Sequence, residues 1–363
     1  MTNRPSSPLA DALAMVAPGR PLRDGLDRIL RANRGALVVV GDGPNVLSIC
    51  SGGFLVDAEF SPQRLSELAK MDGAVILAGD ASRIARANVH LMPRASIPTS
   101  ETGTRHRTAE RVARSIDVTV LSVSAAMSVI AVYRHDQKHT IQPIGWLHDR
   151  TDQALATMQR FRSRFDVALS GLSMLEVEDT VSVGDVVGVV QAAEMVLRIA
   201  EEVDGYLVEL GEDGRLVGLQ SAELIDGVAT ALHLVVRDYC GRSPGRGADR
   251  RSVVDRVVHE LARLPADALR DAGKVAETLG LPGSFHDSES GVEPRGYRLL
   301  YRLPRFSDAI IERIVERFVN LQQIMRASLG ELEQVEGVGQ ARAHQVKDGL
   351  ARLAEAGIFE RYQ

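Results

Sequence analysis

The chain has 363 residues, of which 45% are hydrophobic and 25% charged, with a formal net charge of −5. This length predicts two or three domains with sizeable cores, and the negative balance excludes a protein that coats nucleic acid through bulk charge. The two cysteines, Cys50 and Cys240, lie far apart and predict free thiols rather than a disulfide or a zinc site. The polar first residues lack an apolar signal core, which predicts a cytoplasmic protein. Residues 181–199 are the most apolar later stretch, but the charges within it predict that it does not span a membrane.

The first segments carry both helical and strand patterns. Apolar residues at helical spacing predict helices over residues 9–16 and 22–32. Residues 35–41 are apolar on both sides and predict a buried strand. The Asp-Gly turn that follows favours a return strand over residues 46–50, so we expect a hairpin there.

A short helix then leads into an acidic junction. Ser61 at the cap and Pro62 at the first helical position predict a helix that runs to residue 71. Asp72 and Gly73 follow directly, and residues 75–78 predict a buried strand. Such a junction is an ordinary turn, or the glycine lets a ligand approach while the carboxylate holds a divalent metal that bridges phosphates.

A polar stretch over residues 99–111 is the second candidate for chemistry. Before it we expect a short helical piece over residues 81–87 and an extended segment over 89–93. Within the stretch, the sequence around Thr108 is typical of a helix start. Free N–H groups at that start, together with the guanidinium groups of Arg105 and Arg107, favour a phosphate site. The alternative is a solvated polar loop.

Two more strand patterns, over residues 118–123 and 128–133, complete the first region. Strands that alternate with helices predict one α/β domain built around a mixed sheet.

Asp72-Gly73-Ala74 and Arg105-His106-Arg107, in this order and spacing, resemble the two signature motifs of the diadenylate cyclase domain. The flanking residues 60–71, Phe-Ser-Pro-Gln-Arg-Leu-Ser-Glu-Leu-Ala-Lys-Met, agree as well. Nearly the whole chain is similar to the DNA integrity scanning family, which are diadenylate cyclases with an attached DNA-binding end. The resemblance implies an α/β cyclase domain over residues 1–148, an all-α linker domain over 149–290 and an all-α helix-hairpin-helix domain over 291–363.

The implied reaction is the condensation of two ATP molecules into cyclic di-AMP with release of two pyrophosphates. The residues that would catalyse it are Asp72, Arg105, His106 and Arg107, with Asp72 holding Mg²⁺ or Mn²⁺. The residues that would bind the nucleotide are Gly73, Leu91, Gly103, Thr104, Arg105, Thr108 and Ser124. By resemblance, the backbone around Leu91 lies against the adenine, although an ordinary core leucine fits the pattern too. His106 either contacts phosphate or orders the loop.

One departure from the family pattern follows Ser124. Many family members have charged residues at the next positions, where this chain has Ala125 and Ala126. Ser124 remains a candidate phosphate ligand, but a charged neighbour is missing from this sequence.

Family resemblance also implies an assembly. If each cyclase domain holds one ATP, two domains have to meet face to face to close the ring, and the family pattern is an octamer. The implied partners are ATP and DNA, which would be bound without base-sequence specificity as a branched or damaged structure. This places the protein in the cytoplasm, associated with the nucleoid.

From about residue 149 the strand patterns fade and helical patterns take over. We expect helices over residues 154–172, 192–203, 221–236 and 252–264. Residues 241–251 predict an exposed connection whose arginines either contact DNA or are merely solvated.

The last region offers two candidate DNA surfaces. Residues 295–305 hold four arginines and two tyrosines, which suits a phosphate-contacting surface or a helix surface covered by arginine stems. Gly337-Val338-Gly339, between two predicted helices, resembles the helix-hairpin-helix motif. Main-chain N–H groups there would face a DNA phosphate, with Arg342 and Lys347 nearby.

Two other functions fit parts of this pattern. One is a DNA-binding scaffold whose α/β domain senses ATP without cyclase activity. The other is a linear nucleotidyltransferase that modifies nucleic acid ends.

Overall fold

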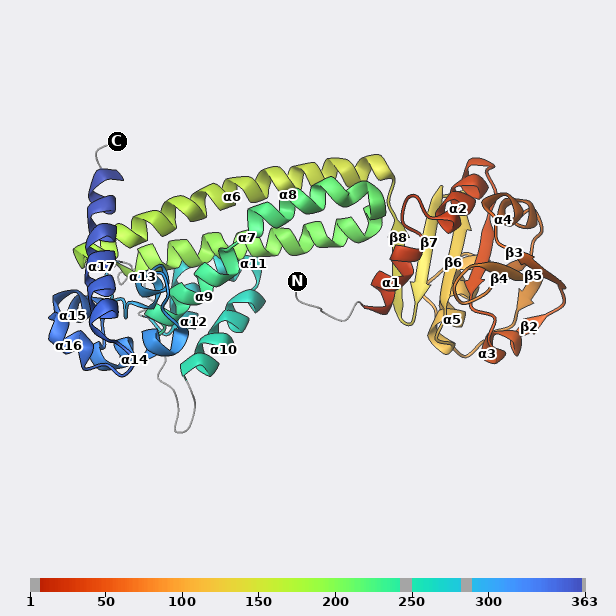
Figure 1. The fold of residues 1–363 in the computed structure, drawn as a ribbon. Coiled ribbons are helices and arrows are strands. Elements are labelled where there is room, and N and C mark those ends of the chain that lie inside the picture. The colour runs from red at the N-terminus through yellow and green to blue at the C-terminus, as the bar shows by residue number, and fades with distance from the viewer. Residues whose placement is uncertain (1–6, 242–249, 282–288, 361–363) are drawn as a thin grey trace. The chain divides into compact units, whose positions relative to one another are not determined.

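The computed structural model describes residues 7–241, 250–281 and 289–360 (Figure 1). They form two compact units. The first holds the described residues within Met1–Gln153 and Val203–Leu219, and the second holds those within Ala154–Glu202 and Gln220–Gln363. Most of the connection predicted over residues 241–251 lies outside the described residues. The boundary predicted near residue 290 stays a prediction, because both sides of it fall within the second unit.

The first unit is built on a mixed sheet of eight strands among the described residues. Its order is β2-β5-β4-β1-β6-β7-β8, with β3 also paired to β5, and only β1 and β4 are parallel neighbours. This confirms the α/β fold with a mixed sheet. The strands are β1 Ala36–Val40, β2 Cys50–Ser51, β3 Phe54–Glu59, β4 Ala74–Leu77, β5 Arg83–Leu91, β6 Thr119–Ser124, β7 Val129–Arg134 and β8 Gln137–Ile141.

Helices cover both faces of this sheet (Figure 1). On one face, apolar residues of α1, α2 and α4, such as Leu26 and Leu65, pack against Val38 of β1. On the other face, Val112 of α5 packs against Val39, the next residue of β1. The alternation of neighbouring side chains across a strand produces these two cores. The helices are α1 Pro8–Met15, α2 Pro21–Arg31, α3 Pro44–Leu47, α4 Pro62–Leu68 and α5 Thr104–Ser115.

Two local predictions for the first unit are wrong. Residues 46–50 do not return as a hairpin strand, because Gly43 and Pro44 start the short helix α3 and β2 pairs with the end of β5 instead. Residues 81–87 are not helical. Residues 81 and 82 lie in the turn after β4, and residues 83–87 open β5. The pairing of β5 with both β3 and β4 outweighs the helical preference of the alanines.

The second unit is helical, as predicted for the region after residue 149. The pattern over residues 221–236 was expected to form one helix but is divided between α8 and α9, because Gly227 adopts a φ of +73° between them. Among the described residues, no helix is both long and apolar enough to cross a membrane. The helices from α6 on are α6 Ile144–Glu178, α7 Val183–Leu210, a 3₁₀ turn Gly211–Gly214, α8 Arg215–Ile225, α9 Val228–Tyr239, α10 Arg250–Arg263, α11 Ala266–Arg270, α12 Ala272–Leu279, α13 Tyr297–Tyr301, α14 Asp308–Phe318, α15 Leu321–Arg326, α16 Leu329–Glu333 and α17 Gln340–Glu360.

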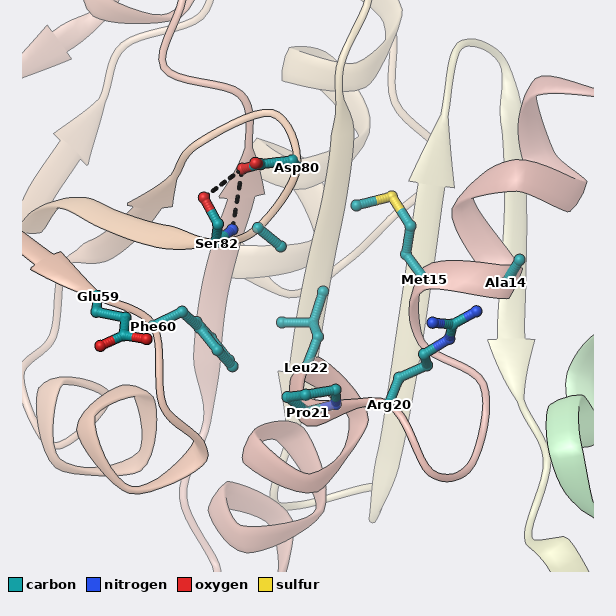
Figure 2. A pocket seen from close by; sticks show the side chains of 10 residues that line it. Ala14, Met15, Arg20, Pro21, Leu22, Glu59, Phe60, Asp80 and Ser82 are labelled. Atoms are coloured by element: carbon teal, nitrogen blue, oxygen red, sulfur yellow. Dashed lines mark hydrogen bonds between the residues drawn. The ribbon is translucent and has the colours of Figure 1, made fainter.

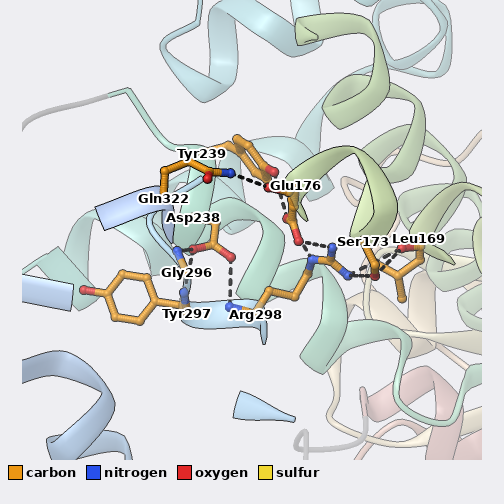
Figure 3. A network of polar contacts seen from close by, with 9 residues as sticks. All are labelled: Leu169, Ser173, Glu176, Asp238, Tyr239, Gly296, Tyr297, Arg298 and Gln322. Atoms are coloured by element: carbon orange, nitrogen blue, oxygen red, sulfur yellow. Dashed lines mark hydrogen bonds and ion pairs between the residues drawn. The ribbon is translucent and has the colours of Figure 1, made fainter. Parts of the chain in front are cut away.

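The stretch over residues 295–305 is buried at residues 296–300 and 303, whereas Tyr301, Arg302 and Arg305 are exposed. Its interpretation as a phosphate-contacting surface therefore stays a prediction for the exposed arginines and does not hold for Arg298. Tyr297 and Arg298 are only 2% and 4% exposed. The Arg298 guanidinium pairs with the buried carboxylate of Glu176 on α6 and donates to the Ser173 hydroxyl at 2.9 Å (Figure 3). A charge removed from water needs such partners, so this arginine stabilises the fold.

The carboxylate of Asp238, at the end of α9, binds the backbone at the start of α13 (Figure 3). Its carboxylate accepts hydrogen bonds from the backbone N–H groups of Gly296, Tyr297 and Arg298 at 2.7–2.9 Å. A carboxylate at a helix N-terminus satisfies donors that would otherwise have no partner. Buried carboxylates from α6 and α9 thus fix the place of α13.

We expect Arg298→Ala to destabilise the second unit by about 3–5 kcal/mol, because it leaves the buried charge of Glu176 without its partner. Thermal unfolding followed by circular dichroism measures this. Arg302→Ala, at an exposed position four residues on, is the control and should change stability by no more than about 0.5 kcal/mol. Equal unfolding midpoints for the two variants would contradict the structural role of Arg298.

Candidate active site

Strand pairing brings the predicted site residues to one end of the sheet. The parallel strands β1 and β4 both begin there, so Asp72 and Gly73 enter β4 at this end. The antiparallel strands β5 and β6 end there, at Leu91 and Ser124. Residues separated by as many as 52 positions in the chain therefore share one edge.

Arg105 and Asp72, one from each signature motif, lie side by side at this edge. An Nη of Arg105 is 3.5 Å from Oδ1 of Asp72, and the Asp72 side chain is 99% exposed. Gly35, just before β1, makes room for the guanidinium, since a Cβ there would lie 2.8 Å from an Arg105 nitrogen. The sequence analysis did not single out Gly35, and a glycine before a strand gives no signal for such a role.

Gly73 has a packing role at the junction. A Cβ at this position would lie 2.3 Å from the backbone of Asn88, and the Gly73 N–H donates to Asn88 Oδ1 at 3.2 Å. Only a glycine allows β5 to approach the start of β4 this closely. Strand packing thus accounts for Gly73 without a ligand.

The helix that carries the second motif starts one turn earlier than predicted. Gly103 is the N-cap of α5, and no side chain among the described residues caps its first N–H groups. Thr108 lies inside the helix, where its hydroxyl donates to the Thr104 carbonyl at 2.9 Å. The prediction of a start at Thr108 is therefore wrong, because the hydroxyl bonds backwards along the helix. Free N–H groups at Thr104 and Arg105 remain available to an anion.

The two residues after Arg105 differ in environment. Arg107 is exposed, whereas His106 is 6% exposed and faces the sheet. Nδ1 of His106 lies 2.8 Å from the hydroxyl of Tyr133 on β7. Burial lowers the pKa of His106, and the positive charges of Lys138 and Arg105 also lower it, against the charge of Glu101. The surroundings of His106 suit the ordering role rather than direct contact with phosphate.

The loop before α5 is tied to the helix that follows it. Glu110, only 7% exposed, accepts from the Thr99 hydroxyl at 2.5 Å and the Ser100 N–H at 3.1 Å. Arg111 and Arg114 donate to the Ile97 and Pro98 carbonyls, at 3.0 and 2.6 Å. Hydrogen bonds thus hold the start of the polar stretch against α5, while residues 102–104 and Arg107 are exposed.

Leu91 and Ser124 lie at the same end of the sheet, on β5 and β6, which are separated by β4 and β1. Leu91 is half-buried and pairs with Cys50 of β2, so its backbone is engaged in the sheet. The hydroxyl of Ser124 accepts from the Met127 N–H at 3.4 Å, a long contact that closes the turn after β6. Their predicted roles toward adenine and phosphate stay predictions.

The donor groups at this edge fit a metal ion only if a nucleotide supplies further ligands. No three His, Cys, Asp or Glu side chains gather as a metal site within the described residues. Asp72 offers one exposed carboxylate. Mg²⁺ keeps several waters and is commonly bound by one or two carboxylates together with substrate phosphates. Asp72 therefore fits an ion that arrives with a triphosphate.

A pocket of about 550 Å³ lies at the opposite end of the sheet (Figure 2). Its walls come from the turn after β4, with Asp80 and Ser82, and from the start of α2, with Arg20 and Leu22. None of the predicted site residues is among those that line it. The signature motifs meet instead on an open edge.

The predicted DNA-binding turn lies in the second unit, between α16 and α17. Gly337 has a φ of +87°, which glycine adopts without strain, and Val338 is 4% exposed and packs in the core of this unit. Gly339 precedes α17, where a Cβ would meet open space. The Gly339 backbone thus lies at an accessible helix start.

The two cations near this turn are tied to backbone carbonyls. Arg342 donates to Gly337 and Lys347 donates to Met325, both at 2.6 Å. Arg342 thus stabilises the turn and Lys347 ties α17 to the end of α15, and the contacts of both side chains with DNA stay predictions.

Comparison with known proteins identifies the family. Residues 23–138 match the model described as DisA bacterial checkpoint controller nucleotide-binding, and residues 141–287 match the DisA bacterial checkpoint controller linker region. A DNA integrity scanning protein DisA of Acidothermus cellulolyticus is 49% identical over 98% of this chain and 95% of its own length. The chain belongs to the DisA family. Proteins of the same name from Streptomyces coelicolor and Kineococcus radiotolerans are also 49% identical, over 97% and 99% of this chain and 93% and 98% of their own lengths. The matched nucleotide-binding region and the family support a nucleotide cyclase.

Proposed function

We propose that the chain condenses two ATP molecules into cyclic di-AMP and two pyrophosphates. The observation that carries this proposal is the pairing of Asp72 with Arg105 beside the uncapped start of α5. In each half-reaction, a ribose 3′-hydroxyl loses its proton, its oxygen forms a bond to the α-phosphorus of the other nucleotide, and the bond from that phosphorus to pyrophosphate breaks. Such transfers depend mostly on positioning and on stabilisation of charge.

The residues at this edge would have different roles, which follow from their chemistry. The N–H groups of Thr104 and Arg105, with the guanidinium groups of Arg105 and Arg107, would bind the triphosphate and stabilise its charge. A Mg²⁺ or Mn²⁺ ion bound at Asp72 would supply Lewis-acid stabilisation of the phosphoryl oxygens. The adenine would lie near the end of β5, at Leu91.

Ring closure requires two such edges. Each domain would hold one ATP, as the resemblance to the family implies, and the exposed side chains of Asp72 and Arg107 leave this edge open to a second domain. Two cyclase domains would therefore meet face to face, each presenting its ATP to the other. The assembly we propose is the octamer of the family pattern, in which cyclase faces are paired.

We also propose that the second unit senses branched or damaged DNA without reading base sequence, in a cytoplasmic, nucleoid-associated protein. From residue 290 on, the chain has eleven Lys and Arg against ten Asp and Glu. Binding there would depend on backbone donors at the start of α17 rather than on net charge. Because few phosphates would be engaged, affinity should fall only moderately with rising salt.

Gly339→Val is expected to weaken DNA binding about tenfold or more, equivalent to about 1.4 kcal/mol. The new side chain meets no neighbour in the described structure but occupies the space through which a phosphate would approach. A fluorescence anisotropy titration with branched DNA measures this. Gly330→Val, also in open space but one helix earlier, is the matched control and should bind normally.

Substitution of Gly337 would answer a different question. A valine there would be strained at a φ of +87°, with its Cβ 3.2 Å from an Arg313 nitrogen, so lost binding would also reflect lost structure. Unchanged DNA affinity in a folded Gly339→Val variant would contradict the proposed contact.

The two other functions are separated by one product assay. An ATP-sensing scaffold yields no cyclic dinucleotide, and a linear nucleotidyltransferase yields a product only when nucleic acid is added. The proposed cyclase needs only ATP and a divalent metal.

A further inference from the structure

Behind the first turn of α5, four side chains form a continuous row of polar contacts. Nδ1 of His106 lies 2.8 Å from the hydroxyl of Tyr133, and that hydroxyl donates to Oε1 of Glu101 at 3.1 Å. Nζ of Lys138 on β8 pairs with the same oxygen of Glu101 at 2.5 Å. Tyr133, Glu101 and Lys138 belong to neither signature motif. Because Tyr133 and Lys138 are on strands, the row anchors the helix to the sheet.

The carboxylate at Glu101 sets the direction of the hydrogen bonds. An ionised carboxylate can only accept hydrogen bonds, so the Tyr133 hydroxyl uses its one hydrogen to donate a hydrogen bond to Glu101. Its oxygen then accepts from Nδ1–H of His106, which leaves Nε2 without a proton in the neutral ring. The lowered pKa of His106, caused first by burial, favours this neutral form.

The contact with Tyr133 is what orients the His106 ring. Its other nitrogen, Nε2, is buried and has no hydrogen-bond partner within the described part of the chain. The N-cap of α5 is Gly103, which has no side chain to hold the first turn. The bond between His106 and Tyr133 therefore helps to hold this turn, in which Arg105 and Arg107 flank His106 in the sequence.

Glu101 also connects this row to the loop. Its N–H donates to the Thr99 hydroxyl at 3.1 Å, and that hydroxyl donates in turn to Glu110 of α5 at 2.5 Å. The loop is thus fixed to α5 through Glu110 and to the sheet through Tyr133 and Lys138. A change of the Glu101 side chain would loosen the tie to the sheet and leave the tie to Glu110, because Glu101 contributes to the latter only through its backbone N–H.

We propose that Tyr133 and Glu101 are positioning residues for phosphoryl transfer and act through His106. They hold the first turn of α5 in one place, so that its N–H groups and its two arginines face the triphosphate in a fixed geometry. This inference rests on the proposed cyclase function. Small displacements of positioning groups reduce the reaction rate more than they reduce binding.

Tyr133→Phe in the full-length chain tests the proposal, because it removes the hydroxyl and keeps the ring. We expect kcat for cyclic di-AMP to fall about tenfold, while KM for ATP changes less than about threefold. Glu101→Gln should give a similar pattern. In a His106→Gln background, Tyr133→Phe should lower kcat by less than about twofold further, since residues that act through one partner are not additive.

Tyr297→Phe is the matched control. It removes another buried hydroxyl, which donates to Glu312 at 2.8 Å in the second unit, and should leave kcat within about twofold of the unmodified chain. Unchanged kcat in folded Tyr133→Phe, or a full tenfold further loss in the His106→Gln background, would overturn the proposal. If Tyr133→Phe does not fold, Glu101→Gln decides in the same way. An unmodified chain that makes no cyclic product would overturn the proposed function itself, which is a separate result.

Discussion

Asp72→Asn should lower cyclic di-AMP production at least about a hundredfold, equivalent to about 2.7 kcal/mol in the activation barrier. The amide keeps the shape of the side chain but is a poor ligand for Mg²⁺ or Mn²⁺. The Asp72 side chain is 99% exposed and its one ion pair within the described residues is with Arg105 at 3.5 Å, so the fold should not change. Most of the ATP affinity should remain, since the arginines and the start of α5 are untouched. Product formation is measured by chromatography, and ATP affinity by calorimetry.

The control is Asp136→Asn, which also neutralises an exposed carboxylate of the first unit. Asp136 lies in the turn between β7 and β8, at the opposite end of the sheet, and pairs with Arg114 at 3.2 Å. The cyclase activity of the Asp136→Asn variant should stay within about twofold of that of the unmodified chain. Near-normal production of cyclic di-AMP by Asp72→Asn would refute the assignment of Asp72.

Arg105→Ala combined with Arg107→Ala should weaken ATP binding and turnover together. Charge-assisted hydrogen bonds contribute about 1.5–3 kcal/mol each, so each lost contact should cost roughly tenfold or more. Arg105 is partly exposed beside Asp72 and Arg107 is exposed, so neither substitution opens a cavity in the core. Steady-state kinetics over a range of ATP concentrations reports both effects.

Arg28→Ala combined with Arg64→Ala removes the same charge from the same unit. Both arginines are exposed, on α2 and α4, which pack on the other face of the sheet from α5. This variant should bind and turn over ATP normally. If the Arg105 and Arg107 variant has the same ATP affinity and turnover as this control, residues 99–111 are a solvated polar loop and do not bind the triphosphate.

The sequence predicts those parts of the site that local patterns encode. Ser61 and Pro62 mark the start of α4, and the motifs that begin at Asp72 and Arg105 lie where the structure brings them together. The start of α5 was misplaced because Thr108 has the composition of a cap, whereas its hydroxyl bonds back to Thr104. A hydroxyl can take either role, and only the backbone geometry decides.

Long-range partners could not be predicted. Tyr133 is 27 residues from His106, and only the pairing of β6 with β7 brings it behind α5. Arg298 has the same composition signal as a DNA-contacting arginine, yet it is buried against Glu176, which is 122 residues away. Charge and spacing do not reveal burial, because burial depends on which distant segment covers the side chain.

The most direct test of the proposed function incubates the purified full-length chain with ATP as the sole nucleotide, a divalent metal and no nucleic acid. Cyclic di-AMP should form with release of two pyrophosphates for each product, and Asp72→Asn should reduce this yield at least about a hundredfold. The absence of cyclic product from the unmodified chain, or a linear product that appears only when DNA or RNA is added, would contradict the proposed cyclase.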